Sequence, residues 1–462
     1  MNDFEESAIL KRQNVIFTLI FLLSFANQLF SQDSHYWTLQ YGTRSTLLGG
    51  AVIGSVTDLG ATYYNPGMLA LLDDPAFILS GAIYQYTQIK FQNALPGQQD
   101  LGYSSLNTAP SLTAGSFSLP GLDKHKFGYS FLTRSKSRIR FSFRDTVVVG
   151  IPGFPEDADQ EGELNYLQDI NDDWFGATWA YHINENLGIG VTPYLSIRGQ
   201  NSNIRSTVFG YFSEGSVAAA DILNEYDYEV WRVLGKLGLG YRKGAFSTGF
   251  SLTTPSLRIF GSGQSAIRRL VSGSPSGNDL LDFNYQDDVK ANYESSWAFG
   301  GGFGYKIGNT TLHFTAEWFD AVQKFTVLET EDVVGQGSGD TLSHNVTLEL
   351  NSTINVGFGV ETLLTPTVQL YGSFITDHSA ANSRAIRNTT VTNWDLFQFA
   401  AGTTFDIKFV ELTLGLTHEF GNRDIPAPVP DIAARTSQEN TKDDVRLSTT
   451  ITKFVFGFSF HF

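Results

Sequence analysis

The last fifteen residues, Ser448-Thr-Thr-Ile-Thr-Lys-Phe-Val-Phe-Gly-Phe-Ser-Phe-His-Phe462, indicate the fold class. From Phe454 onward one register is wholly aromatic and the other is mostly polar or small. Because a β-strand sends alternate side chains to opposite faces, this stretch predicts a strand with one aromatic face. A soluble sandwich would bury that face. Two features favour lipid instead: the stretch stops on Phe462 without a polar tail, and the alternation recurs along most of the sequence.

The composition fits a barrel with a lipid-facing outside and a wet inside. The chain has 462 residues, with 45 Gly, 37 Phe and 19 Tyr, and only 17% of its residues are charged. Apart from the N-terminus, no stretch approaches the roughly 20 apolar residues that a spanning helix needs, which excludes a bundle of membrane helices. The formal net charge of -16 argues against nucleic acid as a partner. Without cysteine, the redox compartment cannot be inferred.

The N-terminal residues predict a signal peptide. Lys11 and Arg12 precede an apolar run over residues 15–25, and the small residue Ser31 is followed by a polar start. This is the order of an n-region, an h-region and a cleavage point, so we assign residues 1–31 to a signal peptide. The alternative, a retained membrane anchor, is disfavoured because the apolar run is short.

Alternating segments from residue 76 onward predict an all-β fold. We expect a transmembrane antiparallel β-barrel of about 14 strands over residues 76–462, with short periplasmic turns and longer outer loops. An even strand number puts both barrel ends on the periplasmic side. The expected strands are 76–91, 111–119, 126–144, 174–183, 186–200, 228–243, 245–261, 289–307, 310–326, 344–363, 365–377, 393–407, 409–420 and 447–462.

The stretch before the first strand does not alternate. Residues 43–72 are rich in small residues and contain Asn65-Pro66-Gly67. Glycine permits tight, irregular backbone and proline withholds a ladder donor, so a folded segment inside the lumen fits better than a strand. An ordinary turn is the alternative interpretation of Asn65-Pro66.

These residues resemble the FadL family, the outer-membrane transporters of long-chain fatty acids and other hydrophobic compounds. The resemblance rests on Gly49-Gly50-Ala51, Asp58 with Ala61, Asn65-Pro66-Gly67 with Leu69, and Pro75. The family has alanine where this chain has Gly67. The resemblance implies that residues 32–75 form a hatch in the lumen, marked by Gly49, Gly50, Asp58, Asn65, Pro66 and Gly67. It also implies that a ligand captured among outer loops passes inward and leaves sideways through a gap at a kinked third strand.

The third predicted strand carries a basic face. The cations on that face are Arg134, Lys136, Arg138, Arg140 and Arg144. Facing lipid, each would cost ~2 to 4 kcal/mol near the membrane midplane, so we expect the row to face the lumen. There it either pairs with acids such as Asp58, Asp73 and Asp74, or attracts a carboxylate or phosphate head group.

Hydroxyls interrupt the opposite, mainly aromatic face of this strand. They belong to Thr133, Ser135 and Ser137. Hydroxyls without partners are costly in hydrocarbon, so these residues predict either a lateral gap or a covering protein element. We favour the gap, because the resemblance implies release of the ligand at this strand.

The outer loops hold further candidates. Asp157, Asp159 and Glu161 have the spacing of a calcium loop, a weak metal candidate because Gln168 replaces the bidentate glutamate. A solvated acidic loop over residues 145–173 is the alternative. The stretches 216–226 and 265–271, the second with Arg268 and Arg269, are expected to be locally helical and to form the capture surface that the resemblance implies.

The sequence therefore predicts a passive outer-membrane transporter of hydrophobic compounds, with long-chain fatty acids as the default ligand, in a Gram-negative bacterium. The expected ligand-binding residues are Arg134, Lys136, Arg138, Arg140, Arg268 and Arg269. Expected partners are membrane lipid and lipopolysaccharide, the hydrophobic ligand and the barrel insertion machinery.

Two alternatives belong to other functional classes. In the first, the barrel is a non-transporting subunit of an outer-membrane secretion, assembly or attachment complex, with partners in that complex. In the second it is an outer-membrane enzyme such as a phospholipase, but no catalytic Ser/His/Asp set, phosphate loop or His/Cys metal cluster is recognisable. We therefore expect no enzyme and no cofactor.

Overall fold

The structure is a computed structural model. It describes residues 34–72, 76–80, 83–95, 99–109, 112–146, 159–211, 217–273, 279–382, 394–407, 410–425 and 445–461. The expected signal peptide lies outside these residues, as do Asp73, Asp74, Pro75, Asp157 and Phe462.

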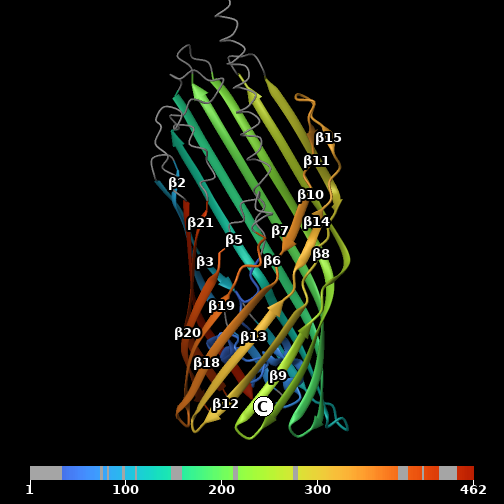
Figure 1. Ribbon diagram of the computed structural model, residues 1–462, viewed down its shortest axis with the longest axis vertical. Coiled ribbons are helices and arrows are strands. Elements are labelled where there is room, and N and C mark those ends of the chain that lie inside the picture. Colours follow the sequence, from blue (N-terminus) through green and yellow to red (C-terminus); the bar gives the residue numbers. More distant parts are fainter. Residues whose placement is uncertain are drawn as a thin grey trace, which may run out of the picture.

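One antiparallel sheet of 18 strand segments closes on itself to form the barrel of Figure 1. The first segments, β1 (Ala76–Ser80) and β2 (Ile83–Leu95), both pair with the last one, β22 (Val445–His461). The other segments are β3 (Gln99–Ala109), β4 (Leu112–Phe117), β5 (His125–Thr146), β6 (Asp159–Asn184), β7 (Leu187–Tyr211), β8 (Val217–Lys243), β9 (Phe246–Thr253), β10 (Leu257–Ser272), β11 (Leu280–Lys290), β12 (Ala298–Ile307), β13 (Thr310–Phe319), β18 (Thr353–Thr365), β19 (Val368–Asp377), β20 (Leu396–Ile407) and β21 (Val410–Ile425).

Some crossings of the barrel wall consist of two strand segments with an interruption between them. β9 and β10 both pair with β8, and their partners on the other side are β12 and β11. Likewise β1 and β2 form one crossing and β3 and β4 form the next, because β3 pairs with β2 and β4 pairs with β1. Grouped in this way, the sheet is compatible with the 14 crossings expected from the sequence, although the number itself stays a prediction.

On one side of the barrel the strands are much longer than the sequence predicts. β6 begins at Asp159, so most of the acidic stretch 145–173 is strand. The expected helices at 216–226 and 265–271 are wrong for the described residues, because residues 217–226 belong to β8 and residues 265–271 to β10. Each is paired along its length, and Leu223 of β8, for example, lies between Arg205 of β7 and Arg268 of β10. Continuous ladder hydrogen bonds on both sides satisfy the backbone and leave no reason for a helix.

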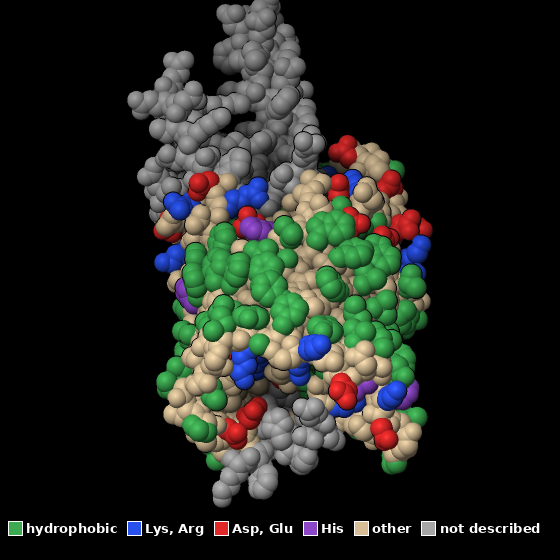
Figure 2. Space-filling view, turned by 60° about the horizontal axis from the view of Figure 1, so that its bottom comes forward, with side chains coloured by type: hydrophobic (Ala, Val, Ile, Leu, Met, Phe, Trp, Pro, Cys, Tyr) green, Lys and Arg blue, Asp and Glu red, His purple; other side chains and the backbone are tan. Residues whose placement is uncertain are grey.

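The alternation at the C-terminal end is confirmed for the side chains that the structure describes. Phe454 and Phe456 are 55% and 41% exposed, whereas Lys453 and Val455 are buried. On the face that Figure 2 shows, hydrophobic side chains gather in a band across the barrel, with charged side chains above and below it. This band is the surface expected to contact lipid.

Three short helices form the folded segment inside the barrel. They are α2 (Thr43–Leu47), α3 (Ala61–Tyr64) and α4 (Pro66–Leu69), and they lie within the lower half of the barrel in Figure 1. We call residues 34–72 the hatch. Among the described residues, no helix is long and apolar enough to cross a membrane.

Inward-facing glycines let the hatch backbone touch the barrel wall. A Cβ atom on Gly238 would lie 2.2 Å from Oδ1 of Asn65, and one on Gly190 would lie 2.4 Å from the carbonyl oxygen of Pro66. Cβ contacts this short are not tolerated, so the wall must be glycine at these positions. The hatch therefore rests against the small, inward-facing residues of the strands, which alternate with outward-facing aromatic residues.

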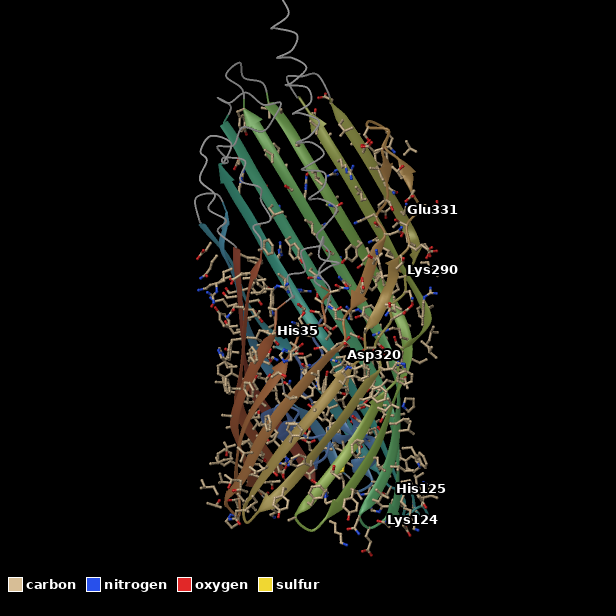
Figure 3. The ribbon with its side chains drawn as sticks, in the orientation of Figure 1. His35, Lys124, His125, Lys290, Asp320 and Glu331 are labelled. Carbon is tan, nitrogen blue, oxygen red and sulfur yellow. The ribbon has the colours of Figure 1, made fainter. Side chains whose placement is uncertain are left out.

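The connection between β13 and β18 forms a folded loop of its own. β14 (Val322–Leu328) pairs with β17 (Val346–Leu350), and β15 (Val333–Val334) pairs with β16 (Thr341–Leu342). The expected strands 310–326 and 344–363 are therefore each divided. In Figure 3, Lys124 and His125 mark the end of the barrel with short turns, and Glu331 of this loop lies toward the other end.

This loop packs on lumen-facing side chains of β8. Leu328 and Leu348 join Tyr226, Tyr228 and Val230 in one buried apolar cluster. The apolar surface that these residues bury holds the loop in place. One side of the upper barrel is thereby filled.

His344 of the loop should make this packing pH-dependent. Its Nδ1 shares a 2.6 Å hydrogen bond with Oγ of Ser265, and burial lowers the pKa of His344 to about 4. An exposed histidine titrates near ~6.5, so the packed loop is fully stabilised above about pH 6.5 and loses stability as the pH falls toward 4. The protection factors of amides over residues 322–350, which are exchange rates corrected for the intrinsic effect of pH, should therefore fall on acidification from pH 7 to 4. In His344→Gln that fall should be much smaller, and an unchanged fall would contradict this cause.

Gly238→Leu should displace the hatch, because the new side chain collides with Asn65 and with the backbone of Pro66 and Gly67. We expect an assembled, heat-modifiable barrel that leaks small solutes in a liposome-swelling assay, since the unplugged lumen would hold water. The matched control is Gly372→Leu, whose Cβ would meet only ordinary contacts, the nearest at 3.7 Å. Equal permeability of the two variants would contradict the seating of the hatch.

Candidate ligand-binding site in the lumen

Asp172 of β6 is the centre of a buried polar network beside the hatch. Its Oδ2 accepts a hydrogen bond from Nη2 of Arg232 at 2.6 Å and lies 3.8 Å from Nη1 of Arg198. Its Oδ1 accepts from Oγ of Ser196 at 2.6 Å and from Nε1 of Trp174 at 3.0 Å. Three adjacent strands, β6, β7 and β8, thus supply one charged cluster inside the lumen.

A second ion pair joins the barrel to the hatch. Nζ of Lys236 lies 3.7 Å from Oε1 of Glu317 and 4.3 Å from the ring centroid of Tyr63. Oε2 of Glu317 accepts a 2.8 Å hydrogen bond from Nε1 of Trp37. Two hatch aromatics therefore contact this barrel ion pair.

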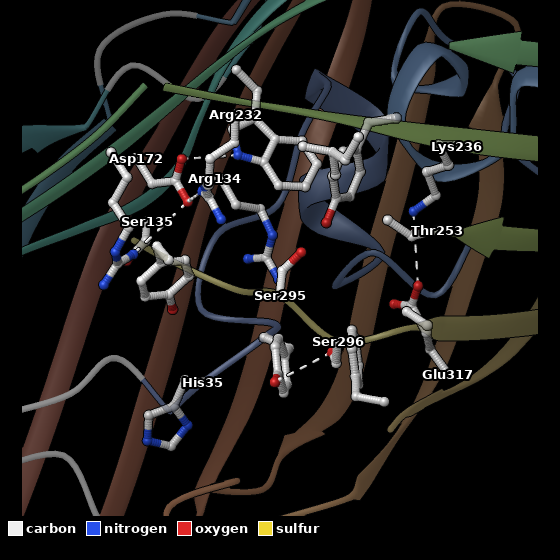
Figure 4. A pocket seen from close by; sticks show the side chains of 18 residues that line it. His35, Arg134, Ser135, Asp172, Arg232, Lys236, Thr253, Ser295, Ser296 and Glu317 are labelled. Carbon is white, nitrogen blue, oxygen red and sulfur yellow. Dashed lines mark hydrogen bonds and ion pairs between the residues drawn. The ribbon is translucent and has the colours of Figure 1, made fainter. Parts of the chain in front are cut away.

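These groups surround a cavity of about 70 Å³, drawn in Figure 4. We call it the cationic cavity. Its lining carries two more positive than negative charges: the cations are Arg134, Arg198, Arg232 and Lys236, and the carboxylates are Asp172 and Glu317. Nε of Arg232 is buried and donates to no acceptor among the described residues. An excess of buried positive charge favours the binding of an anion.

A larger cavity of about 260 Å³ adjoins the cationic cavity, and His35 and Ser135 line both. We call it the apolar cavity, after the hydrophobic part of its lining: Leu39, Ile89, Ile139, Trp394, Leu396 and Ile451. The rest of its lining is polar and includes the charged residues Lys136, Arg138 and Asp169. The two cavities together offer a cationic end and a larger space with one hydrophobic part to a single molecule.

An apolar cluster continues from the apolar cavity along the lumen-facing side of the long strands. Ile139 packs in it with Tyr166, Ile204 and Leu447. Tyr166 also stacks on Phe141, with ring centroids 4.7 Å apart. Hydrophobic side chains therefore run along the part of the lumen that the folded loop leaves free.

A β-bulge in β5 decides which of its side chains face the lumen. The register of β5 with β6 shifts between Thr133 and Ser135. Below the bulge, Leu132 is buried inside and Phe131 is exposed outside. Above it, Ile139 is the buried inner residue. An extra residue in one strand reverses the faces of all residues beyond it.

The bulge overturns the expected orientation of most of the basic row. Arg138 pairs with Asp169, whose side chain lies on the outer face of β6, and both side chains are partly exposed. Arg144 pairs with Glu161 in the same outer register. Lys136 and Arg140 are likewise exposed, and Lys136 and Arg138 also line the edge of the apolar cavity. The expected orientation assumed one unbroken alternation along the strand, whereas Arg134 is the residue of the row that lines the cationic cavity.

The same bulge places the hydroxyls of Thr133, Ser135 and Ser137 on different faces of β5. Thr133 stays in the outer register but is buried, and its Oγ1 donates a 2.7 Å hydrogen bond to Oδ1 of Asp173. Ser135 and Ser137 line the apolar cavity. The bulge thus turns Ser135 and Ser137 away from lipid, and their assignment to a lateral gap stays a prediction.

β5 separates from its neighbour just where these serines lie. It pairs with β4 from Phe127 to Leu132, and beyond that point the described residues contain no pairing between β5 and β3. The hydroxyl of Tyr103 donates a 3.0 Å hydrogen bond to the carbonyl of Arg138 across this interval. The apolar cavity is lined from both sides of it, by Asn107 of β3 and by Ser137 of β5.

The hatch residues named from the resemblance hold the hatch itself. Gly49 and Gly50 have positive φ values of 63° and 74°, which glycine adopts without strain. Asp58 accepts hydrogen bonds from the backbone N–H groups of Ser45 and Gly60, so it does not pair with the basic row.

The Asn65-Pro66-Gly67 motif ties the hatch to the wall. Asn65 accepts from the N–H of Gly67, and its Nδ2 donates to the carbonyls of Ile53 and Leu239. Pro66 occupies the first turn of α4, where a missing N–H costs little. The ordinary turn considered as the alternative would not need the bond to Leu239 in β8.

Other candidates lie apart from the cavities. Arg268 pairs with Asp221 at 2.7 Å on the outer surface of the long strands, and Arg269 is buried on the opposite register of β10. Glu161 is held by Arg144. Across the described part of the chain, no group of three or more His, Cys, Asp or Glu could hold a metal ion.

Most residues of the cationic cavity carry no strong signal in the sequence. Arg198, Arg232 and Lys236 were not singled out, although Lys236 shares the inward register of Gly238 and Gly240. A charged residue within a glycine register was the available signal. The partner Asp172 lies 60 residues before Arg232, and Glu317 lies 81 residues after Lys236, so no local pattern could have joined them.

Neither a family model nor a curated protein matches the sequence. Solved structures match over nearly the whole length. A Pseudomonas aeruginosa FadL homologue has 12% identity and a TM-score of 0.57, covering 94% of this chain and 99% of that chain. The Pseudomonas putida toluene transporter TodX has 13% identity and a TM-score of 0.59, with coverages of 94% and 100%. The Ralstonia pickettii toluene transporter TbuX has 13% identity and a TM-score of 0.52, with coverages of 92% and 99%.

At such low identity the likeness concerns the fold. The closed antiparallel barrel, its apolar outer band and the hatch in its lumen are the features that the resemblance in residues 43–72 implies. The protein is therefore a β-barrel with the fold of the FadL-type hydrophobic compound transporters.

Proposed function

We propose that this barrel passively imports hydrophobic compounds with an acidic head group, long-chain fatty acids above all, across the outer membrane of a Gram-negative bacterium. One observation carries the proposal: the cationic cavity adjoins the larger apolar cavity, and His35 and Ser135 line both. A carboxylate would occupy the first cavity and the hydrocarbon chain the second.

The charge balance favours an acid over a neutral hydrocarbon. Asp172 and Glu317 offset only part of the positive charge in the cationic cavity. A desolvated, charge-assisted hydrogen bond from arginine to a carboxylate contributes about 1.5 to 3 kcal/mol. We assign this role to Arg134, which lines the cationic cavity with its guanidinium carbon 5.9 Å from the ring centroid of Trp174 and 6.0 Å from that of Tyr36.

The proposed path avoids the hatch. The ligand enters along the apolar cluster around Tyr166 and Ile204 and reaches the apolar cavity. It then leaves through the interval between β3 and β5, the lateral gap expected from the resemblance. The glycine-seated hatch blocks the direct route down the lumen.

Arg134→Gln should weaken the binding of hexadecanoic acid about tenfold or more, and that of its methyl ester much less, because only the acid can use a charge-assisted bond. Asp172 keeps its partners Arg198 and Arg232 in this variant. Binding to the purified barrel can be followed by tryptophan fluorescence, since Trp174 and Trp394 line the cavities.

The matched control is Arg140→Gln, which removes an arginine from the outer surface of the same strand. It should leave the affinities for both compounds unchanged. Equal losses for acid and ester in Arg134→Gln would mean that Arg134 supports the barrel without contacting the head group. If the parent protein bound neither compound and liposomes containing it took up neither, the non-transporting subunit of an outer-membrane complex would replace the transporter.

A further inference from the structure

The hatch and the bulge of β5 are directly joined by one side chain. The hydroxyl of Tyr41 donates a 3.1 Å hydrogen bond to the carbonyl of Thr133 and lies 3.4 Å from that of Arg134. These two carbonyls belong to the bulge itself. Tyr41 is fully buried, so no solvent competes for its hydroxyl.

Other hatch residues hold Tyr41 in this position. Its backbone N–H donates a 3.0 Å hydrogen bond to the hydroxyl of Tyr64. Its ring lies 4.3 Å from that of Tyr63, centroid to centroid. The hydroxyl of Tyr41 is therefore presented by the folded hatch and moves with it.

A bulge leaves part of the ladder unpaired, and a buried carbonyl without a donor is costly. Tyr41 supplies a donor at the point where β5 stops pairing with β4 and separates from β3. The same bulge turns Ser137 inward and brings Arg134 to the cationic cavity. One hydrogen bond thus lies at the junction of hatch, gap and cavity.

We propose that Tyr41 is a positioning residue through which the seated hatch keeps the interval between β3 and β5 open. Without its hydroxyl, the carbonyl of Thr133 gains a donor by straightening the bulge and resuming strand pairing, which narrows the interval. The importance of this for transport rests on the proposed function, but the narrowing itself does not.

The chain contains no cysteine, so the width of the interval can be measured by disulfide formation. Continuing the register of β4 with β5 beyond the pair Leu112–Leu132 would place Asn107 opposite Ser137. In the structure these residues line the apolar cavity from its two sides. The parent for the test is Asn107→Cys with Ser137→Cys, oxidised in membranes without ligand, because a disulfide needs Cβ atoms about 4 Å apart.

Adding Tyr41→Phe to this parent should accelerate disulfide formation about tenfold, the effect expected from the loss of one buried hydrogen bond. Tyr64→Phe, which removes the acceptor that positions Tyr41, should accelerate it in the same direction. The matched control is Tyr194→Phe. It also removes a hydroxyl bond between barrel and hatch, from Tyr194 to the carbonyl of Thr62 at 2.7 Å, but leaves the bulge intact. It should not change the rate.

Each variant is first shown to be a heat-modifiable barrel, so that a folding failure is recognised. Equal rates in the parent, Tyr41→Phe and Tyr64→Phe would overturn the proposal, as would an equal acceleration in Tyr194→Phe. Because no ligand is present, this result is independent of whether the protein carries acids. Faster disulfide formation together with unchanged acid binding would separate the two questions, leaving Tyr41 as the support of the interval alone.

Discussion

The structure depends on direct contact between the backbone of the hatch and the wall of the barrel. Asn65, Pro66 and Gly67 reach the wall only because Gly190 and Gly238 present no side chain there. Through this contact the side-chain amide of Asn65 donates a hydrogen bond to the carbonyl of Leu239 in β8, a strand that otherwise pairs with its neighbouring strands. The lower lumen is filled by polypeptide in this way, and whatever passes the barrel must go around the hatch.

The charged groups of the lumen follow from the same arrangement. Buried cations are stable only with partners, and Asp172 and Glu317 provide them from neighbouring and distant strands. Trp37 and Tyr63 of the hatch complete the second of these pairs. The hatch is thus part of the cavity as well as the plug below it, so a ligand at the cavity would contact both.

The bulge in β5 is the second decisive feature. Because of the bulge, Arg134 of β5 faces the lumen, whereas the cations beyond it lie on the outer face of the strand. The ion pairs of Arg138 and Arg144 with β6 lie on the outer surface, where water reduces their contribution to stability. The polar inner residues beyond the bulge face a cavity instead of lipid.

The sequence by itself determined the barrel and the hatch. The aromatic register around Phe454 is a periodic signal that burial on one face and lipid contact on the other impose on a strand. The small-residue stretch around Asn65 is a local signal of a different kind, because it lacks that alternation. Only the tertiary structure decided the site. The direction of Arg134 depends on one inserted residue that no periodicity reveals, and the partners of Arg232 and Lys236 lie on strands far along the chain. Side-chain alternation is fixed by neighbours in sequence, whereas charge pairing in a lumen is fixed by closure of the sheet.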